Sequence, residues 1–182
     1  MKTLSRKRTE ALQLEHLQYR QRPAGTSVMQ VVMLDMSASM LKANKLARAK
    51  GYLLAIAEKA YRDREHIGVI GFGGKGAHWL QHPSKAQAFN DGWVDPVGGG
   101  GGTPLMAALD LLGPLLARCN QKVRVWVLTD GRFEHLPEKP QYMDDCLIVD
   151  FESDALALQR GKVLARQWGA QWASPFGLMK GE

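Results

Sequence analysis

The stretch Val31-Val-Met-Leu-Asp-Met-Ser-Ala-Ser-Met-Leu41 runs from an apolar segment into one carboxylate and two hydroxyl side chains. Residues 28–34 are largely apolar, which is typical of a strand that a parallel sheet buries on both faces. Asp35, Ser37 and Ser39 then follow at steps of two residues. Because Asp and Ser are also ordinary turn residues, this stretch alone is compatible with either a turn or a ligand site.

The composition indicates a single globular domain. The chain has 182 residues, of which 45% are hydrophobic and 23% are charged. Its two cysteines, Cys119 and Cys146, are far apart and form no CxxC pair, so neither a zinc site nor a disulfide framework is indicated. No segment resembles a signal peptide or a membrane span. We therefore expect a cytoplasmic protein that does not bind membranes.

Positive charge is concentrated at the start of the chain. Residues 1–30 carry a net charge of +4 out of a total of +6. We expect a basic N-terminal arm at residues 1–27 and one domain at residues 28–182. No pattern of aromatic residues for base stacking accompanies the charge, so we expect docking to an acidic partner and no nucleic acid binding.

Predicted strands and helices alternate along the rest of the chain. This order predicts an α/β fold of three layers, with a doubly wound, mostly parallel sheet, one short antiparallel edge strand and helices on both faces. The strands are expected at residues 28–34, 66–72, 77–81, 122–130, 146–151 and 170–173, and the helices at about 40–64, 104–119 and 155–169.

The helix expected at about 40–64 has an apolar stripe that includes Leu53, Ala57 and Tyr61. Lys42 and Lys45 fall outside this stripe, so we expect both side chains on the solvent face.

Oxygen-bearing side chains follow two of the predicted strands. In open α/β sheets, ligands bind at the carboxyl ends of the strands, where the strand order reverses. Asp35 and Asp130 both end predicted strands, and Ser37 and Ser39 follow the first of them. These side chains are therefore expected at one edge of the sheet.

A run of five glycines, residues 98–102, precedes Thr103 and allows the backbone to turn tightly there. Thr103 would then join the two aspartates and two serines at the sheet edge. A set of oxygen donors with only two carboxylates suits Mg²⁺, with Mn²⁺ as the alternative, and lacks the sulfur and imidazole ligands that zinc prefers.

Together, Asp-x-Ser-x-Ser at 35–39, Thr103 after a glycine-rich loop and Leu-Thr-Asp-Gly-Arg at 128–132 resemble the metal-ion-dependent adhesion site of von Willebrand factor A domains. The resemblance covers residues 28 to about 173. It implies that the serines and the threonine contact the metal and that both aspartates hold it directly or through water. It also implies one open coordination position for an Asp or Glu of a partner protein. Further partner contacts are expected at Arg132, Gly102 and Met36, with a salt bridge from Arg132 to Glu134 or another surface acid as the alternative role of that arginine.

Longer segments resemble one branch of this family, the C-terminal domain of the D subunit of magnesium and cobalt chelatases. These segments are residues 49–80, 98–105, 128–132 and 146–153. The resemblance implies an adaptor that is not catalytic alone. Its partners would be an AAA+ ATPase subunit and the large tetrapyrrole-binding subunit of the chelatase.

Other functions remain open at this point. An adaptor of a MoxR-type AAA+ complex that matures another enzyme would share these features. A Mg²⁺ enzyme in which Asp35 or Asp130 acts on a phosphate is an alternative of another class, although only Arg132 offers a phosphate clamp. An extracellular adhesin would share the fold but would need a secretion signal.

Residues 71–76 match the dinucleotide-binding pattern GxGxxG. No helix is expected directly after them, so the glycines are better explained by the turn of a β-hairpin. No Gly-x₄-Gly-Lys-Ser/Thr sequence occurs, so we expect no ATP binding by this chain.

Overall fold

A computed structural model describes residues 28–74, 76–87, 102–143, 145–153 and 157–175. Its central feature is one six-stranded sheet with the strand order β3-β2-β1-β4-β5-β6. The strands are β1 (Val28–Asp35), β2 (His66–Gly73), β3 (Gly76–Lys85), β4 (Lys122–Thr129), β5 (Asp145–Asp150) and β6 (Gln171–Ala173).

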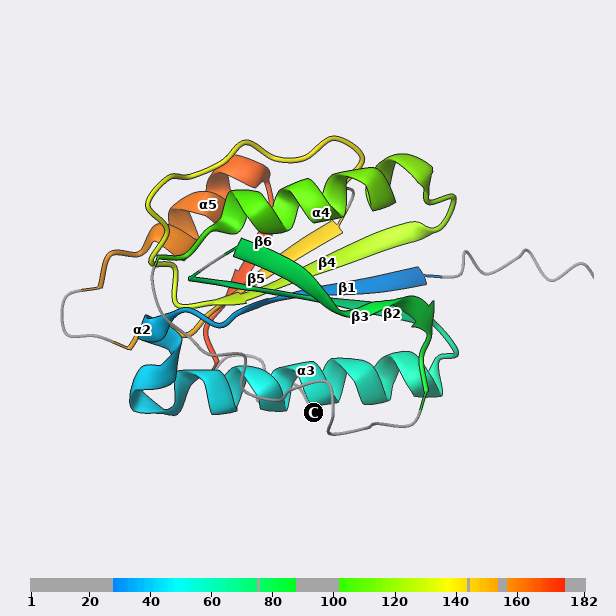
Figure 1. Ribbon diagram of the computed structural model, residues 1–182, viewed down its shortest axis with the longest axis horizontal. Helices are drawn as coiled ribbons and strands as arrows, with labels where there is room; N and C mark the ends of the chain where they lie inside the picture. The colour runs from blue at the N-terminus through cyan, green and yellow to red at the C-terminus, as the bar shows by residue number, and fades with distance from the viewer. Residues whose placement is uncertain (1–27, 75, 88–101, 144, 154–156, 176–182) are drawn as a thin grey trace, which may run out of the picture.

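Helices cover both faces of this sheet. In Figure 1, α4 and α5 lie above it and α3 lies below it, so the molecule has three layers. The helices are α2 (Ala38–Leu41), the 3₁₀ turn η2 (Lys42–Asn44), α3 (Lys45–Arg62), α4 (Leu105–Arg118) and α5 (Arg160–Trp168). The predicted fold class is confirmed.

Of the six strands that the structure describes, only β3 runs antiparallel to its neighbour, β2. The two strands form a hairpin in which Gly73 pairs with Gly76, so the GxGxxG match is a hairpin turn, as predicted. The edge strand is longer than predicted. It has 10 residues and continues through Pro83. Proline has no amide hydrogen to donate, and this is tolerated at a sheet edge, where no further strand pairs.

Strand β1 is buried on both faces because its side chains alternate between two apolar cores. On one face, Val31 and Met33 pack with Leu112 of α4 and Trp168 of α5. On the other, Val32 and Leu34 pack in a second core with residues of α3 such as Leu53. Packing on both faces thereby fixes the register of β1 and the position of its carboxyl end.

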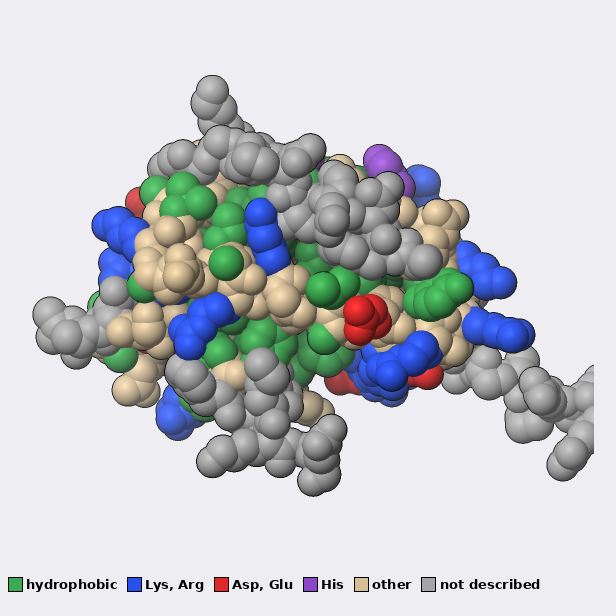
Figure 2. Space-filling view, turned by 90° about the horizontal axis from the view of Figure 1, so that it is seen from below, with side chains coloured by type: hydrophobic (Ala, Val, Ile, Leu, Met, Phe, Trp, Pro, Cys, Tyr) green, Lys and Arg blue, Asp and Glu red, His purple; other side chains and the backbone are tan. Residues whose placement is uncertain are grey.

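The helix predicted at about 40–64 is interrupted. Ala43 and Asn44 have φ values of 51° and 55°, which end η2 and turn the chain before α3 starts. Tyr61, predicted in the apolar stripe, is 52% exposed. Figure 2 shows the face on which α3 lies, where basic side chains are spread between patches of apolar surface.

The helix predicted at 155–169 begins only at Arg160, because residues 157–159 are irregular. The basic arm at residues 1–27 and the glycines at 98–101 lie outside the described residues. Within the part of the chain that the structure describes, no helix combines the length and hydrophobicity that crossing a membrane requires.

Candidate functional site

The candidate site lies at β1, where the strand order in the sheet reverses. From β1 the chain continues to β2 on one side, whereas β4 pairs with β1 on the other side. Parallel pairing sets Leu34 opposite Leu128, so Asp35 and Asp130 both lie at the carboxyl ends of these central strands. This is the position at which open α/β sheets bind ligands.

Asp35 is completely buried, and both of its carboxylate oxygens accept hydrogen bonds. Its Oδ1 accepts a bond of 2.9 Å from the backbone N–H of Ser37, which forms the tight turn after β1. Its Oδ2 accepts a bond of 2.6 Å from Thr129 Oγ1. The Thr129 hydroxyl in turn accepts a bond of 3.0 Å from the N–H of Gly131. Asp35 therefore ties the loop after β1 to the loop after β4.

The two predicted serines connect Asp35 to Asp130. Ser37 Oγ and Ser39 Oγ lie 3.0 Å apart, and Ser39 Oγ donates to Asp130 Oδ1 over 3.1 Å. Asp130, like Asp35, is 0% exposed. Four of the five predicted ligands thus form one hydrogen-bonded group.

Thr103, the fifth predicted ligand, is brought to the same edge by its neighbour. The N–H of Gly74 donates to the carbonyl of Gly102 over 3.1 Å. A Cβ on Gly73 would lie only 3.0 Å from the Ser37 nitrogen, so this hairpin packs directly on the serine loop. Thr103 is 7% exposed, and among the described residues its hydroxyl is not hydrogen-bonded to the other four ligands.

Lys45 is part of this cluster, contrary to the prediction that it faces solvent. It is 1% exposed, and its Nζ lies 3.1 Å from Asp130 Oδ2. The backbone turn at Ala43 and Asn44 makes Lys45 the first residue of α3. Because helical side chains tilt toward the N-terminus, that of Lys45 reaches back to the sheet edge.

The three predicted partner contacts differ in exposure. Gly102 is exposed, and the Arg132 side chain is 41% exposed with its Nε 3.9 Å from Asp130 Oδ2. Met36 is only 8% exposed. A Cβ on Gly71 would lie 2.4 Å from Met36 Cε, which shows that the methionine packs on β2. Gly102 and Arg132 therefore lie on the surface, whereas the Met36 side chain does not.

Burial raises the pKa of Asp35 from 3.8 to about 6. The hydrogen bonds from Thr129 and Ser37 act in the opposite direction, and the negative charge of Asp130 raises the pKa further. Asp35 is thus mostly ionised at neutral pH, but burial of its negative charge costs free energy. A nearby cation would reduce this cost.

We expect this raised pKa to make the metal-free protein less stable as the pH rises from 4 to 7. In this window the folded state retains a proton on Asp35 that the unfolded state has released, so stability falls with pH. The Asp35 contribution corresponds to about 3 kcal/mol. It can be measured by urea unfolding in EDTA, as the difference between wild type and Asp35→Asn. Parallel pH profiles for the two proteins would contradict the assignment.

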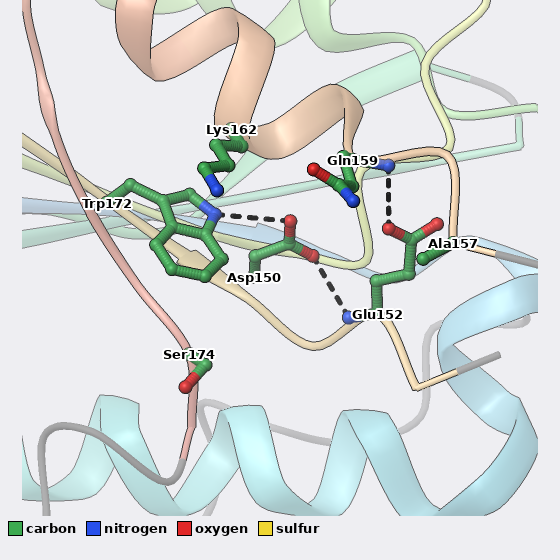
Figure 3. Close-up of a pocket in the computed structure, with 7 residues that line it drawn as sticks. All are labelled: Asp150, Glu152, Ala157, Gln159, Lys162, Trp172 and Ser174. Carbon is green, nitrogen blue, oxygen red and sulfur yellow. Dashed lines mark hydrogen bonds between the residues drawn. The ribbon is translucent and has the colours of Figure 1, made fainter. Parts of the chain in front are cut away.

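A hollow of about 260 Å³ lies at the carboxyl end of the next strand, β5. Figure 3 shows Asp150 in its wall, accepting hydrogen bonds from the Glu152 N–H at 3.0 Å and from Trp172 Nε1 at 3.3 Å. Glu152 accepts the N–H groups of Leu158 and Gln159 before α5. Both carboxylates thus bond to groups of the protein and shape the loop beside the site.

Among the described residues, no group of three or more His, Cys, Asp or Glu side chains could hold a metal ion. A cation at the candidate site would therefore depend on hydroxyl oxygens as well as on Asp35 and Asp130. That donor set fits a hard cation such as Mg²⁺. In addition, among the described residues the two buried carboxylates face one buried ammonium, that of Lys45, while the Arg132 guanidinium beside Asp130 is partly exposed. The buried part of the site therefore retains an excess negative charge for a cation to balance.

Residues 30–132 match the family model for the von Willebrand factor type A domain. The chain belongs to this family. The match begins in β1 and ends at Arg132, so it spans both Asp35 and Asp130. It establishes the family without assigning a metal to the site.

The curated relatives include two subunits of magnesium chelatases. The chain is 32% identical over 106 residues to the magnesium-chelatase 67 kDa subunit of Chlorobaculum tepidum, a match covering 56% of this chain and 17% of the relative. It is 30% identical over 102 residues to the 60 kDa subunit of Rhodobacter capsulatus, covering 54% and 18%. The chain therefore spans less than a fifth of these relatives.

Solved structures support the fold. A von Willebrand factor type A protein from Catenulispora acidiphila matches with a TM-score of 0.60 and 17% identity, covering 84% of this chain and 40% of that one. The VWA domain of SpRpn10 matches with a TM-score of 0.56 and 12% identity, covering 82% and 87%.

Sequence reasoning missed two residues of the cluster. Thr129 lies in the Leu-Thr-Asp-Gly-Arg segment. It follows Val127 by two residues in a strand, so its side chain is expected on the same buried face, and this signal could have identified it. Lys45 carried no such signal, because its burial follows from the backbone turn before α3.

Proposed function

We propose that this chain is a protein-interaction domain that depends on a divalent cation, Mg²⁺ or alternatively Mn²⁺. The cation would be held by Asp35, Ser37, Ser39, Thr103 and Asp130. The observation that carries the proposal is the partly buried, hydrogen-bonded chain from Asp35 through the two serines to Asp130, at the switch point of the sheet.

The oxygens of Asp35, Ser37, Ser39 and Asp130 already lie close together, which supports a cation site. Among the described residues, no buried side-chain nitrogen or oxygen lacks a hydrogen-bond partner. A bound cation would therefore replace bonds such as that between the Ser37 and Ser39 hydroxyls, and it would stabilise oxygens that already converge. Mg²⁺ keeps several water ligands, which a partner's carboxylate can replace.

The surface next to the cluster supports an interaction role. Gly102 is exposed beside Thr103, and Arg132 presents a partly exposed guanidinium beside Asp130. A partner that inserts an Asp or Glu toward the cation would meet this guanidinium as well. Arg132 and Gly102 are therefore proposed as partner contacts.

The relatives suggest the kind of assembly. Since the matched relatives are magnesium-chelatase subunits, we propose that the chain is an adaptor in an ATP-driven magnesium or cobalt chelatase. An AAA+ ATPase subunit and a large tetrapyrrole-binding subunit would be its partners. Because ATP drives such an assembly, the cytoplasm is the proposed location.

The domain boundaries enter this proposal as well. Residues 28–182 would form the interaction domain, and residues 1–27 would form a basic docking arm. The arm carries most of the net positive charge and would meet an acidic surface of a partner.

The proposal is tested by capturing partners from the native cell on immobilised wild-type protein and on Asp35→Asn, each in Mg²⁺ and in EDTA. We expect an AAA+ ATPase or a large chelatase subunit to bind wild type in Mg²⁺ only. Asp35→Asn should fold, because it removes a buried charge and keeps the side-chain shape, but should capture no partner. Leu41→Gln, at an exposed position in α2, is a control that should retain capture.

Capture that is insensitive to both EDTA and Asp35→Asn would overturn the role of the cation. ATP hydrolysis by the purified chain would overturn the adaptor function.

A further inference from the structure

Lys45 gives the candidate site an unusual charge balance. Asp35, Asp130 and Lys45 are each at most 1% exposed. The two oxygens of Asp130 face different groups. Oδ1 accepts from Ser39 Oγ at 3.1 Å, and Oδ2 lies 3.1 Å from the Lys45 ammonium. The ammonium is therefore part of the same buried cluster as the proposed ligands.

The position of this ammonium is enforced by packing. Lys45, Ala49 and Leu53 are spaced by four residues, so they share one face of α3, and all three are buried. Burial of this face of α3 and the 3.1 Å contact with Asp130 hold the Lys45 side chain at the sheet edge. The charge is thus a fixed element of the site, unlike a mobile surface lysine.

With both carboxylates ionised, the buried residues Asp35, Asp130 and Lys45 carry a net charge of −1, and without Lys45 they would carry −2. The Arg132 guanidinium, 3.9 Å from Asp130 Oδ2, is 41% exposed, so water screens its charge and it is left out of this sum. A bound divalent cation would bring the cluster to +1, whereas without Lys45 it would reach only neutrality. In a buried site, where charges are poorly screened, this difference affects both the cation and the next ligand.

We propose that Lys45 is a built-in cation that weakens divalent-metal binding and makes the loaded site net positive, so that it selects a carboxylate-bearing partner. This inference rests on the proposed function, since it assumes that a divalent cation binds among these residues. Lys45 acts here as a positioning and selectivity residue and not as a metal ligand.

The first test is calorimetric titration of Mg²⁺ into wild type, Lys45→Gln, Lys45→Arg and Lys42→Gln. Lys45→Gln keeps a hydrogen-bond donor but removes the charge, so we expect it to bind Mg²⁺ at least about tenfold more tightly. Lys45→Arg retains the charge and should bind like wild type. Lys42→Gln is the matched control, because Lys42 is exposed only three residues away. If Lys45→Gln purifies only with Mg²⁺, competition against EDTA provides its affinity.

The second test uses acetate as a minimal carboxylate on Mn²⁺-loaded protein. Water-proton relaxation reports the water molecules on Mn²⁺, and acetate that enters the site displaces them. We expect acetate to lower the relaxation rate at several-fold lower concentration in wild type and Lys45→Arg than in Lys45→Gln.

Three results would overturn the proposal, and they are distinguishable. The role of Lys45 is wrong, and the proposed function stands, if wild type binds Mg²⁺ but Lys45→Gln binds it no more tightly. The same conclusion follows if acetate lowers the relaxation rate at equal concentrations in Mn²⁺-loaded wild type and Lys45→Gln. If neither protein binds Mg²⁺ or Mn²⁺, the proposed function fails. If only Lys45→Gln binds metal, the lysine replaces the metal in this chain, and both proposals fail.

Discussion

Replacing Asp130 with asparagine is expected to destabilise the protein by about 3 kcal/mol and to weaken Mg²⁺ binding by at least about 100-fold. The substitution removes the negative charge that lies 3.1 Å from the buried Lys45 ammonium, so that this ammonium faces a neutral amide. A buried charge that loses its counter-charge costs more than the pair contributes. The same change removes one of the two carboxylates from the proposed cation site.

Two further variants separate these effects. The double variant Asp130→Asn/Lys45→Gln should recover most of the lost stability in urea unfolding, because both charges are then absent, but it should not recover Mg²⁺ binding. Asp35→Asn should lose Mg²⁺ binding without the loss of stability, since burial already disfavours the charge of Asp35 and raises its pKa to about 6. Equal destabilisation by Asp35→Asn and Asp130→Asn would show that the ion pair with Lys45 does not matter.

Gly131→Ala is expected to be the most damaging small substitution next to the site, at about 2–4 kcal/mol. Gly131 has a φ of 71°, which an L-residue with a side chain rarely adopts. A Cβ there would also lie 2.9 Å from the backbone nitrogen of Gly161 in α5. Since the Gly131 N–H donates to the Thr129 hydroxyl that binds Asp35, displacement of this loop should reach the carboxylate.

Gly169→Ala is the matched control for this prediction. Gly169 ends α5 with a similar φ of 61°, but a Cβ there would have no neighbour within 4 Å. It should therefore cost only the backbone strain, about 1 kcal/mol. The difference between the two variants in thermal or urea unfolding measures how closely the loop after β4 packs on α5. Equal effects would mean that the loop moves aside freely.

Much of the fold follows from the sequence because hydrophobic patterns report directly on burial. The uninterrupted apolar run in β1 predicts a strand covered on both faces, and the structure places it at the centre of the sheet between β2 and β4. The alternation of strands and helices predicts parallel pairing. The exact ends of the strands were harder to predict. Pro83 is acceptable in β3 only because β3 lies at the edge of the sheet, and the edge is known only from the strand order.

The sequence also predicts which side chains gather at the candidate site. Asp35 and Asp130 end predicted parallel strands, and such strands deliver their last residues to one edge of the sheet. Serines at two-residue steps and a threonine after glycines supply the hydroxyl oxygens. No tertiary information was needed to expect an oxygen-rich site with two carboxylates at this edge.

Only the tertiary structure decided how that site is held and charged. Thr129 donates to Asp35 across 94 residues of sequence, and this contact exists because β1 and β4 are neighbours in the sheet. The helical pattern assigned Lys45 to solvent, yet the left-handed turn at Ala43 and Asn44 directs it to Asp130. Periodicity describes the faces of a regular element. The direction of a side chain at the start of a helix depends on the backbone before it and on the elements packed against it.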